Sequence, residues 1–104
     1  MIKTFKMHER FGSFLGDGEA ANRLRMDEVL PALDECEGIV FDFAGVENMT
    51  HSFANACIAN LIIDRGTEAK AKLRFINCSD VVKLFLKAAL DLGLAHSGQP
   101  AISH

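Results

Sequence analysis

Thr50, His51 and Ser52 are the neighbouring side chains whose types come nearest to reactive chemistry in this sequence. A serine next to a histidine resembles the nucleophile and base of a serine hydrolase. Successive residues at a helix start diverge by about 100°, however, so these two side chains would not face each other. We therefore expect no catalytic residue and no enzyme activity. Either Ser52 or Thr50 could simply be the helix N-cap, and Ser52 could otherwise be a position for contact or modification.

Metal and cofactor chemistry finds little support in the sequence. The four histidines are scattered, at positions 8, 51, 96 and 104, and the three cysteines, at 36, 57 and 78, lack paired ligand spacing. Glycines at 12, 16 and 18 match neither a dinucleotide-binding nor a P-loop pattern. We expect no metal and no cofactor, and we expect the cysteines to be reduced. Arg10, Arg23 and Arg25 near these glycines could form an anion-binding spot.

The overall charge argues against two classes of partner. The chain has 104 residues, with 11 Lys and Arg against 14 Asp and Glu, a net charge of -3. It has no excess of cations to neutralise nucleic-acid phosphates. No apolar run reaches the roughly 18 residues of a membrane span. We expect one cytoplasmic domain that binds neither nucleic acid nor membrane.

The amino-terminal third predicts an edge strand and an interrupted helix. Residues 1–7 alternate imperfectly between apolar and polar types, and 11–15 could form a second strand. Whether these residues make a hairpin or an arm stays open. Residues 19–36 have a helical composition, but their apolar side chains point in two opposite directions. Pro31 also opposes a regular helix, so we expect a break near 25–27.

The remaining elements alternate between strand and helix. Residues 38–43 predict a central strand buried on both faces, and 73–77 predict a parallel neighbour. A helix is expected from Ser52 to about residue 65, and another from Ser79 to Gly93. The last helix should bury an apolar side formed by residues 81, 82, 84, 85, 88, 89 and 92. The pattern defines an α/β domain over 1–93 with a loose tail over 94–104.

One face of the helix that starts at Ser52 carries no charge. Its members are Ser52, Asn55, Ala56, Ala59, Asn60 and Ile63. A solvated helix face usually carries Lys and Glu, so we interpret this face as a contact surface. The partner-binding residues that we predict are Thr50, His51, Ser52, Asn55, Ala56, Ala59 and Ile63.

The segment 38–54, GIVFDFAGVENMTHSFA, resembles the STAS-like family of bacterial domains. The family pattern runs roughly v-x-x-D-F-x-G-V and then S-F-A/L into a helix. That family is itself similar to the anti-sigma-factor antagonists, in which a D-S-S-G sequence starts the corresponding helix. The stretch around residues 16–25 and the strand at 75–77 also resemble the STAS-like pattern, so that the likeness covers about residues 10–92.

The resemblance implies a small mixed sheet with packed helices and a non-catalytic role in partner switching. In the antagonists, an ATP-dependent serine kinase that is also an anti-sigma factor phosphorylates a serine that matches Ser52 by position. Here Thr50-His51-Ser52-Phe53 replaces D-S-S-G, so that the acidic residue and the glycine are both missing. The resemblance therefore makes Ser52 a phosphorylation candidate and an ATP-binding kinase or ATPase a candidate partner.

Asp42 and Asn48 are predicted to shape the site. A carboxylate in an apolar strand needs hydrogen-bond partners or a solvated strand end. Asp42 could accept backbone N–H groups from the 44–50 turn, shape that turn beside Ser52, or contact a partner's nucleotide. Two other functions stay open. One is a small-ligand or nucleotide sensor at the carboxyl edge of the strands, and the other is self-association as a homodimer.

Overall fold

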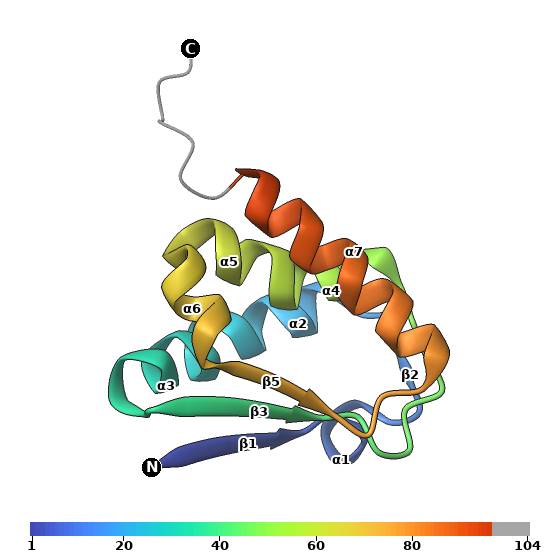
Figure 1. Cartoon of the computed structure of the whole chain (residues 1–104). Helices are drawn as coiled ribbons and strands as arrows, with labels where there is room; N and C mark the ends of the chain where they lie inside the picture. Colours follow the sequence, from blue (N-terminus) through green and yellow to red (C-terminus); the bar gives the residue numbers. More distant parts are fainter. Residues whose placement is uncertain (97–104) are drawn as a thin grey trace.

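Three parallel strands form the main sheet, and helices cover one of its faces (Figure 1). The computed structural model describes residues 1–96. The strands are β1 (Ile2–Lys6), β3 (Gly38–Asp42) and β5 (Leu73–Ile76), with β3 in the centre. The predicted α/β class, the edge position of β1 and the parallel pairing of β3 with β5 are confirmed. The resemblance implied a mixed sheet, whereas every strand pair within residues 1–96 is parallel.

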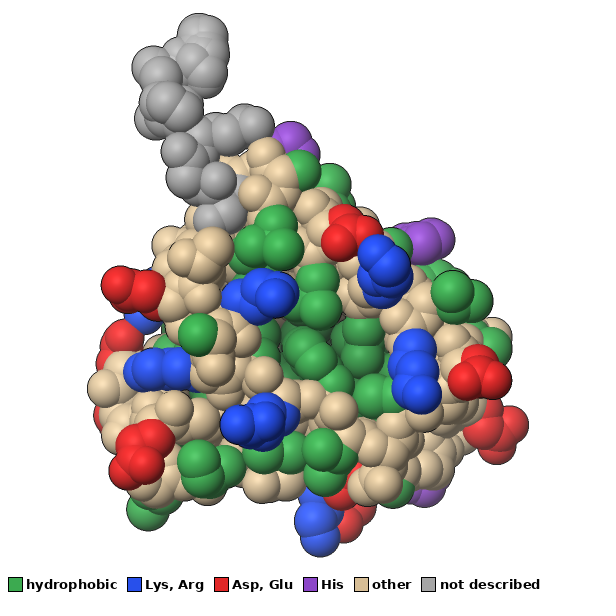
Figure 2. All heavy atoms as spheres, viewed as in Figure 1, with side chains coloured by type: hydrophobic (Ala, Val, Ile, Leu, Met, Phe, Trp, Pro, Cys, Tyr) green, Lys and Arg blue, Asp and Glu red, His purple; other side chains and the backbone are tan. Residues whose placement is uncertain are grey.

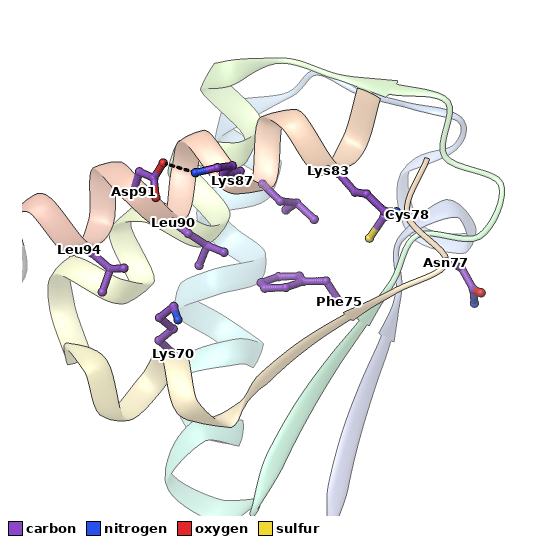
Figure 3. Close-up of a pocket in the computed structure, with 10 residues that line it drawn as sticks. Lys70, Phe75, Asn77, Cys78, Lys83, Lys87, Leu90, Asp91 and Leu94 are labelled. Atoms are coloured by element: carbon purple, nitrogen blue, oxygen red, sulfur yellow. Dashed lines mark hydrogen bonds and ion pairs between the residues drawn. The ribbon is translucent and has the colours of Figure 1, made fainter. Parts of the chain in front are cut away.

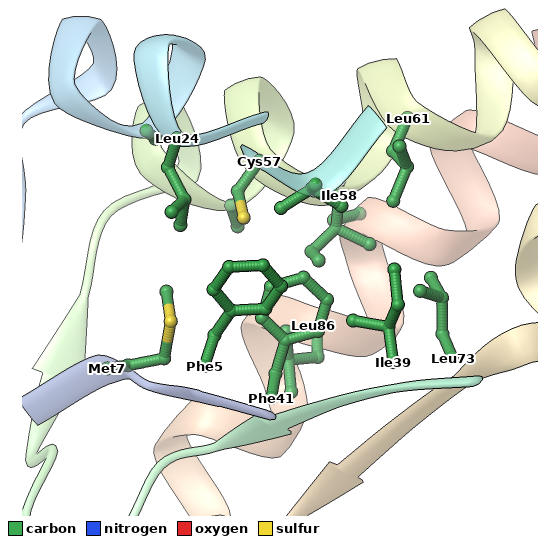
Figure 4. Close-up of a cluster of buried hydrophobic side chains, with 14 of the residues drawn as sticks. Phe5, Met7, Leu24, Ile39, Phe41, Cys57, Ile58, Leu61, Leu73 and Leu86 are labelled. Atoms are coloured by element: carbon green, nitrogen blue, oxygen red, sulfur yellow. The ribbon is translucent and has the colours of Figure 1, made fainter. Parts of the chain in front are cut away.

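A row of phenylalanines crosses the sheet on its covered face. Phe5 is in register with Phe41, and Phe41 with Phe75. Their ring centroids lie 5.6 and 5.8 Å apart, in stacked arrangements. Figure 4 shows two of these rings pointing toward the helix layer, where they meet Cys57 and Ile58. This aromatic row supplies much of the interface between the two layers.

The prediction that the central strand is buried on both faces is wrong. Val40 points to the uncovered face and is only half-buried. On the same face Ile2 and Ile76 are 55% and 40% exposed. The strand reads as a continuous apolar run, yet the described helices lie on the other side of the sheet (Figure 1). An apolar run shows that a strand is central but does not show how many layers cover it.

The residues after β1 form neither a hairpin nor an arm. They form the short helix α1 (Met7–Phe11) and the two-residue strand β2 (Phe14–Leu15). β2 pairs in parallel with β4 (Asn48–Met49), which the sequence analysis missed. The predicted strand at 11–15 is therefore confirmed only at its end. This small second sheet joins the amino-terminal segment to the turn that precedes Thr50.

The predicted break in the first long helix is confirmed. Helix α2 (Gly18–Leu24) continues into a π-helical turn, η1 (Arg25–Val29), and then into α3 (Leu30–Glu35). Pro31 is the second residue of α3, directly after the π-helical turn. The π-helical turn rotates the following residues, so that Leu24 and Val29 both reach the core.

The second long helix also contains a π-helical turn, which was not predicted. It consists of α4 (His51–Ala54), η2 (Asn55–Ala59) and α5 (Asn60–Arg65), and Gly66 ends it with a positive φ of 75°. The predicted helix and its glycine end are confirmed. The short helix α6 (Thr67–Lys72) follows directly and was missed.

Helix α7 (Asp80–His96) begins as predicted but continues past its predicted end. The Ser79 hydroxyl accepts the Val82 N–H at 3.1 Å, which confirms the cap. Gly93 is buried inside the helix, where its missing side chain allows close contact with Ile62 and the Ala59 carbonyl. The boundary at residue 93 and the loose tail are therefore wrong for 94–96. Residues 97–104 of the predicted tail lie outside the described residues.

The three cysteines are free thiols, in agreement with the prediction. Cys36 and Cys57 are buried in the core, and Cys78 is half-buried. Complete burial raises the pKa of the Cys57 thiol to about 12, so this cysteine is a packing residue rather than a nucleophile.

Candidate functional site

Ser52 lies at the start of α4, but it is not the N-cap. The Thr50 hydroxyl accepts the Phe53 N–H at 3.1 Å and caps the helix, which begins at His51. Ser52 is the second helical residue, and its side chain is exposed. The hydroxyl is therefore accessible at a helix end where negative charge is favoured. Of the two cap interpretations, the one at Thr50 is confirmed.

Ser52 borders a hollow between the start of α2 and the start of α4. We call it the Ser52 hollow. It is lined by Gly16, Asp17, Gly18, Glu19, Asn22, Arg23, Ser52 and Ala56. A Cβ atom added at Gly18 would overlap the Ser52 hydroxyl, so a side chain there would require this hydroxyl to rotate away. Gly18 thus allows a close approach between the start of α2 and the start of α4.

The Ser52 hollow carries more negative than positive charge. Asp17 caps α2 by accepting the N–H groups of Glu19 and Ala20 at 3.0 and 3.1 Å. Glu19 is exposed in the first turn of α2, and Arg23 is the one cation among the lining residues. A phosphoryl group on Ser52 would thus lie near two carboxylates and one guanidinium.

Arg25 fixes the position of α2 against the Ser52 helix, and the sequence analysis missed this role. It is 8% exposed, and its Nε donates to the Ala56 carbonyl at 2.8 Å. Its other nitrogens donate to Asp64, at 2.7 Å, and to Asn22. Arg25 begins η1 and Ala56 belongs to η2, so this side chain joins the two π-helical turns. The sequence offered one signal for this role, which was the position of an arginine on the apolar side of a broken helix.

The predicted anion-binding spot does not form. Arg10 makes a two-pronged ion pair with Glu28, with both distances 2.7 Å, and Arg25 is paired with Asp64. The hydrogen bond from Arg10 lowers the pKa of the Glu28 carboxyl below its usual range. Of the three arginines, Arg23 alone lines the Ser52 hollow.

Asp42 shapes its turn, as one of the predicted alternatives held, but it does not line the Ser52 hollow. Its Oδ1 accepts the Asn77 side-chain amide and the Ala44 N–H, both at 3.0 Å. These two hydrogen bonds, Asn77 first, lower the pKa of the Asp42 carboxyl. Asp42 instead borders a separate hollow with Lys6.

Asn48 acts locally as well. Its side-chain oxygen accepts the N–H of Met49 at 2.8 Å, and its side chain is exposed at the start of β4. The structure therefore does not bring Asp42 and Asn48 together at Ser52. Asn48 belongs to the strand that leads into Thr50, and its contribution to the site is to hold that strand end.

The predicted contact face is only partly on the surface. Ile63 is 39% exposed, and Asn55 and Ala56 are half-buried beside α2. Ala59 is fully buried, because Gly93 of α7 lies directly against it. Ala59 is therefore a packing residue, and its prediction as a partner contact is wrong. Small uncharged residues are needed wherever two helices approach closely, whether inside a domain or between molecules.

His51 is exposed next to Phe85 of α7, with ring centroids 4.7 Å apart. This contact joins the Ser52 helix to the side of α7 that was predicted to be buried. Val81, Leu84 and Leu92 of α7 are 39%, 69% and 39% exposed. The prediction is confirmed for Val82 and Ala89, which are buried together with Leu86 and Gly93. The exposed apolar side chains of α7 are the contact candidates that sequence reasoning missed.

A parallel sheet under a helix layer, with an exposed serine near the start of a helix beyond the central strand, is consistent with a STAS-like α/β fold. A family model described as a STAS-like domain of unknown function matches residues 20–83, from α2 into α7. The chain belongs to this STAS-like family. A search of curated proteins and a search of solved structures each found no match.

Within residues 1–96, no three His, Cys, Asp or Glu side chains lie close enough to hold a metal ion. None of the helices in that part of the chain is both long enough and apolar enough to cross a bilayer.

Proposed function

We propose that this STAS-like domain is a non-catalytic regulatory module of the bacterial cytoplasm that docks a protein partner through the start of α4. The observation that carries the proposal is the exposed Ser52 hydroxyl beside Gly18, on a helix whose cap is provided by Thr50. Since another residue makes the cap, the Ser52 hydroxyl is not required to hold the helix end.

The docking surface has an uncharged centre. Its members are Thr50, His51, Ser52, Asn55, Ala56 and Ile63, together with the exposed side chains of α7 that continue from Phe85. Leu84, at 69% exposure, is the most exposed leucine of that helix. Exposed apolar side chains next to small uncharged ones are typical of protein-binding surfaces.

Phosphorylation of Ser52 would reverse the character of this surface. A phosphoryl group adds a charge of about -1.5 to -2 at neutral pH. At Ser52 this charge would lie beside Asp17 and Glu19, with Arg23 as the nearby cation. The cost of desolvating this charge would weaken docking of an uncharged partner surface. The partner that we propose is an ATP-binding serine kinase or ATPase that carries out this modification itself.

The proposal is tested by capturing partners from an extract of the source cells with three forms of the chain. Ser52→Asp should reduce capture at least tenfold relative to the unchanged chain. Thr67→Asp is the matched control, because it places the same charge on an exposed residue at the start of α6, away from the Ser52 hollow. Equal capture by Ser52→Asp and Thr67→Asp would remove the switch.

The kinase part of the proposal needs a separate measurement. The chain is incubated with the captured partner and ATP, and the modified residue is mapped by mass spectrometry. Modification at Ser52 with release of the partner supports the proposal. Modification elsewhere, or release without modification, would contradict it. Circular dichroism of Ser52→Asp checks that the loss of capture is not a loss of fold.

Neither alternative is favoured at the positions that the sequence predicted for it. At the carboxyl edge of the strands, Asp42 is occupied by Asn77, and Ser79 is occupied as a helix cap. Self-association through the small residues of the Ser52 helix would need Ala59, which is buried inside the protomer.

A further inference from the structure

A groove with an apolar floor lies between α7 on one side and β5 and α6 on the other. We call it the α7 groove. Its volume is about 560 Å³. Its apolar lining residues are Phe75, Leu86, Leu90 and Leu94. Figure 2 shows a depression with hydrophobic side chains at its bottom, and Figure 3 shows Phe75, Leu90 and Leu94 along the groove. This volume falls within the usual range of small-molecule sites, roughly 300–1,000 Å³.

Lysines surround this apolar floor. Lys70 comes from α6, and Lys83 and Lys87 come from α7, so that cations lie on both sides of the groove (Figures 2 and 3). Asp91 is the single acidic lining residue, and it is paired with Lys87 at 3.1 Å. Within residues 1–96, neither Lys70 nor Lys83 forms an ion pair with an acidic group.

We propose that the α7 groove binds a small amphiphile with one carboxylate, namely a medium-chain fatty acid. The apolar chain would lie on Phe75, Leu90 and Leu94, and the carboxylate would meet Lys83 or Lys70. The chain as a whole is acidic, with a net charge of -3, so two lysines without acidic partners beside one apolar depression favour an anionic ligand. This site is separate from the Ser52 hollow, and the proposal does not depend on the docking function.

Cys78 provides a direct report on occupancy. It lines the end of the groove near Lys83, as Figure 3 shows, and it is half-buried. Cys36 and Cys57 are buried elsewhere in the core and serve as internal references. Burial raises the pKa of the Cys78 thiol, so alkylation with iodoacetamide is best measured at mildly alkaline pH.

The experiment titrates the full chain with octanoate, decanoate and dodecanoate below their micelle concentrations. Affinity is measured by NMR shifts, and alkylation of each cysteine is measured by mass spectrometry. Each added methylene should tighten binding about fourfold. Decanoate at saturation should slow Cys78 alkylation at least fivefold, and 1-decanol should bind at least tenfold more weakly than decanoate. Equal binding of decanol and decanoate, or alkylation of Cys78 that decanoate leaves unchanged, would overturn the proposal.

Variants separate this site from nonspecific adsorption. The double variant Lys70→Gln, Lys83→Gln should weaken decanoate at least tenfold and leave decanol within twofold. Lys3→Gln is the control, because Lys3 is an exposed lysine on β1 outside the groove. Leu90→Asn, a change at a half-buried floor position, should weaken both ligands. Decanoate binding that is equal in the double variant and in Lys3→Gln would exclude the lysines as the headgroup site.

Discussion

The Ser52 hollow and the α7 groove are both formed where helices meet, yet they differ in chemistry. The first has a polar lining with two carboxylates and a serine hydroxyl, and it is bordered by helix starts. The second has an apolar floor and three lysines, and it is bordered by the length of α7. Helix starts expose backbone N–H groups and polar caps, whereas the side of a helix exposes whatever its sequence places there. The Ser52 hollow is therefore suited to modification of the serine or to contact with a protein partner, and the α7 groove is suited to binding a small molecule.

The largest expected difference between the Ser52 hollow and the α7 groove follows from replacing Arg25, which joins α2 to the Ser52 helix. Arg25→Met keeps the apolar stem but leaves the Ala56 carbonyl and Asp64 without their donor. Because this arginine is nearly fully buried, we expect a loss of about 2–3 kcal/mol in the free energy of unfolding. NMR signals should shift around the Ser52 hollow and remain unchanged at the α7 groove.

Arg10→Met is the matched control for Arg25→Met. Arg10 also forms a short ion pair, with Glu28, but both side chains are more than a third exposed. An exposed pair of this kind contributes less than about 1 kcal/mol. Urea denaturation of the two variants distinguishes them. Equal losses in both would show that Arg25 acts as an ordinary surface charge.

Gly93 gives the corresponding test on the groove side. In Gly93→Ala the new Cβ would meet the Ile62 Cβ at 2.7 Å and the Ala59 carbonyl oxygen at 2.9 Å, so α7 must move. Overpacking costs about 1–3 kcal/mol, and the higher helix propensity of alanine offsets up to about 1 kcal/mol. We expect a net loss of about 1–2 kcal/mol, measured by urea denaturation, and NMR shifts along the α7 groove.

Ala88→Ser is the control for Gly93→Ala. Ala88 lies on the exposed side of the same helix, and a change there should stay within about 0.5 kcal/mol. A Gly93→Ala variant as stable as the unchanged chain would mean that the contact between α7 and α5 is loose.

Within the first turn of α4, the roles of Thr50 and Ser52 can be compared directly. Thr50→Ala removes the acceptor of the Phe53 N–H and should cost about 1 kcal/mol. Ser52→Ala should change stability by less than about 0.5 kcal/mol, because Ser52 does not make the cap. Thermal unfolding of the two variants side by side measures the difference. A larger loss for Ser52→Ala than for Thr50→Ala would reverse the assignment.

The sequence was most informative where one local rule decides the outcome. Opposed apolar faces and Pro31 predicted the break at η1, and the composition around Gly66 predicted the helix end. The two-residue strands β2 and β4 could not be predicted, because their pairing depends on a tertiary approach rather than on a pattern. The same holds for Arg25, whose partners Ala56 and Asp64 lie more than thirty residues away in the sequence.

Helix α7 shows why the candidate site was only partly predictable. Apolar residues occupy most of the circumference of this helix, so a helical wheel does not show which side is buried. The buried side is determined by close packing at Ala89 and Gly93. As a result Leu84 is exposed, and Leu90 and Leu94 line the α7 groove. The Ser52 helix shows a similar ambiguity. A small uncharged residue can lie against another helix of the same domain or against a partner, and for this reason Ala59 was wrongly predicted as a partner contact.

The smallest expected effect concerns Asp42, at the sheet end next to the α7 groove. Asn77, which also lines the groove, donates to Asp42, and the pKa of this carboxyl is lowered in the folded protein. A lowered folded pKa means that the charged form contributes stability above the unfolded pKa, about 3.9, and that this contribution is lost as pH falls through the folded value. Asp42→Asn keeps the shape of the side chain and removes the charge. Urea denaturation should therefore show the variant less stable than the unchanged chain at pH 7, with the difference shrinking below about pH 4. A difference that stays constant from pH 7 to pH 3 would assign the effect to geometry rather than to charge.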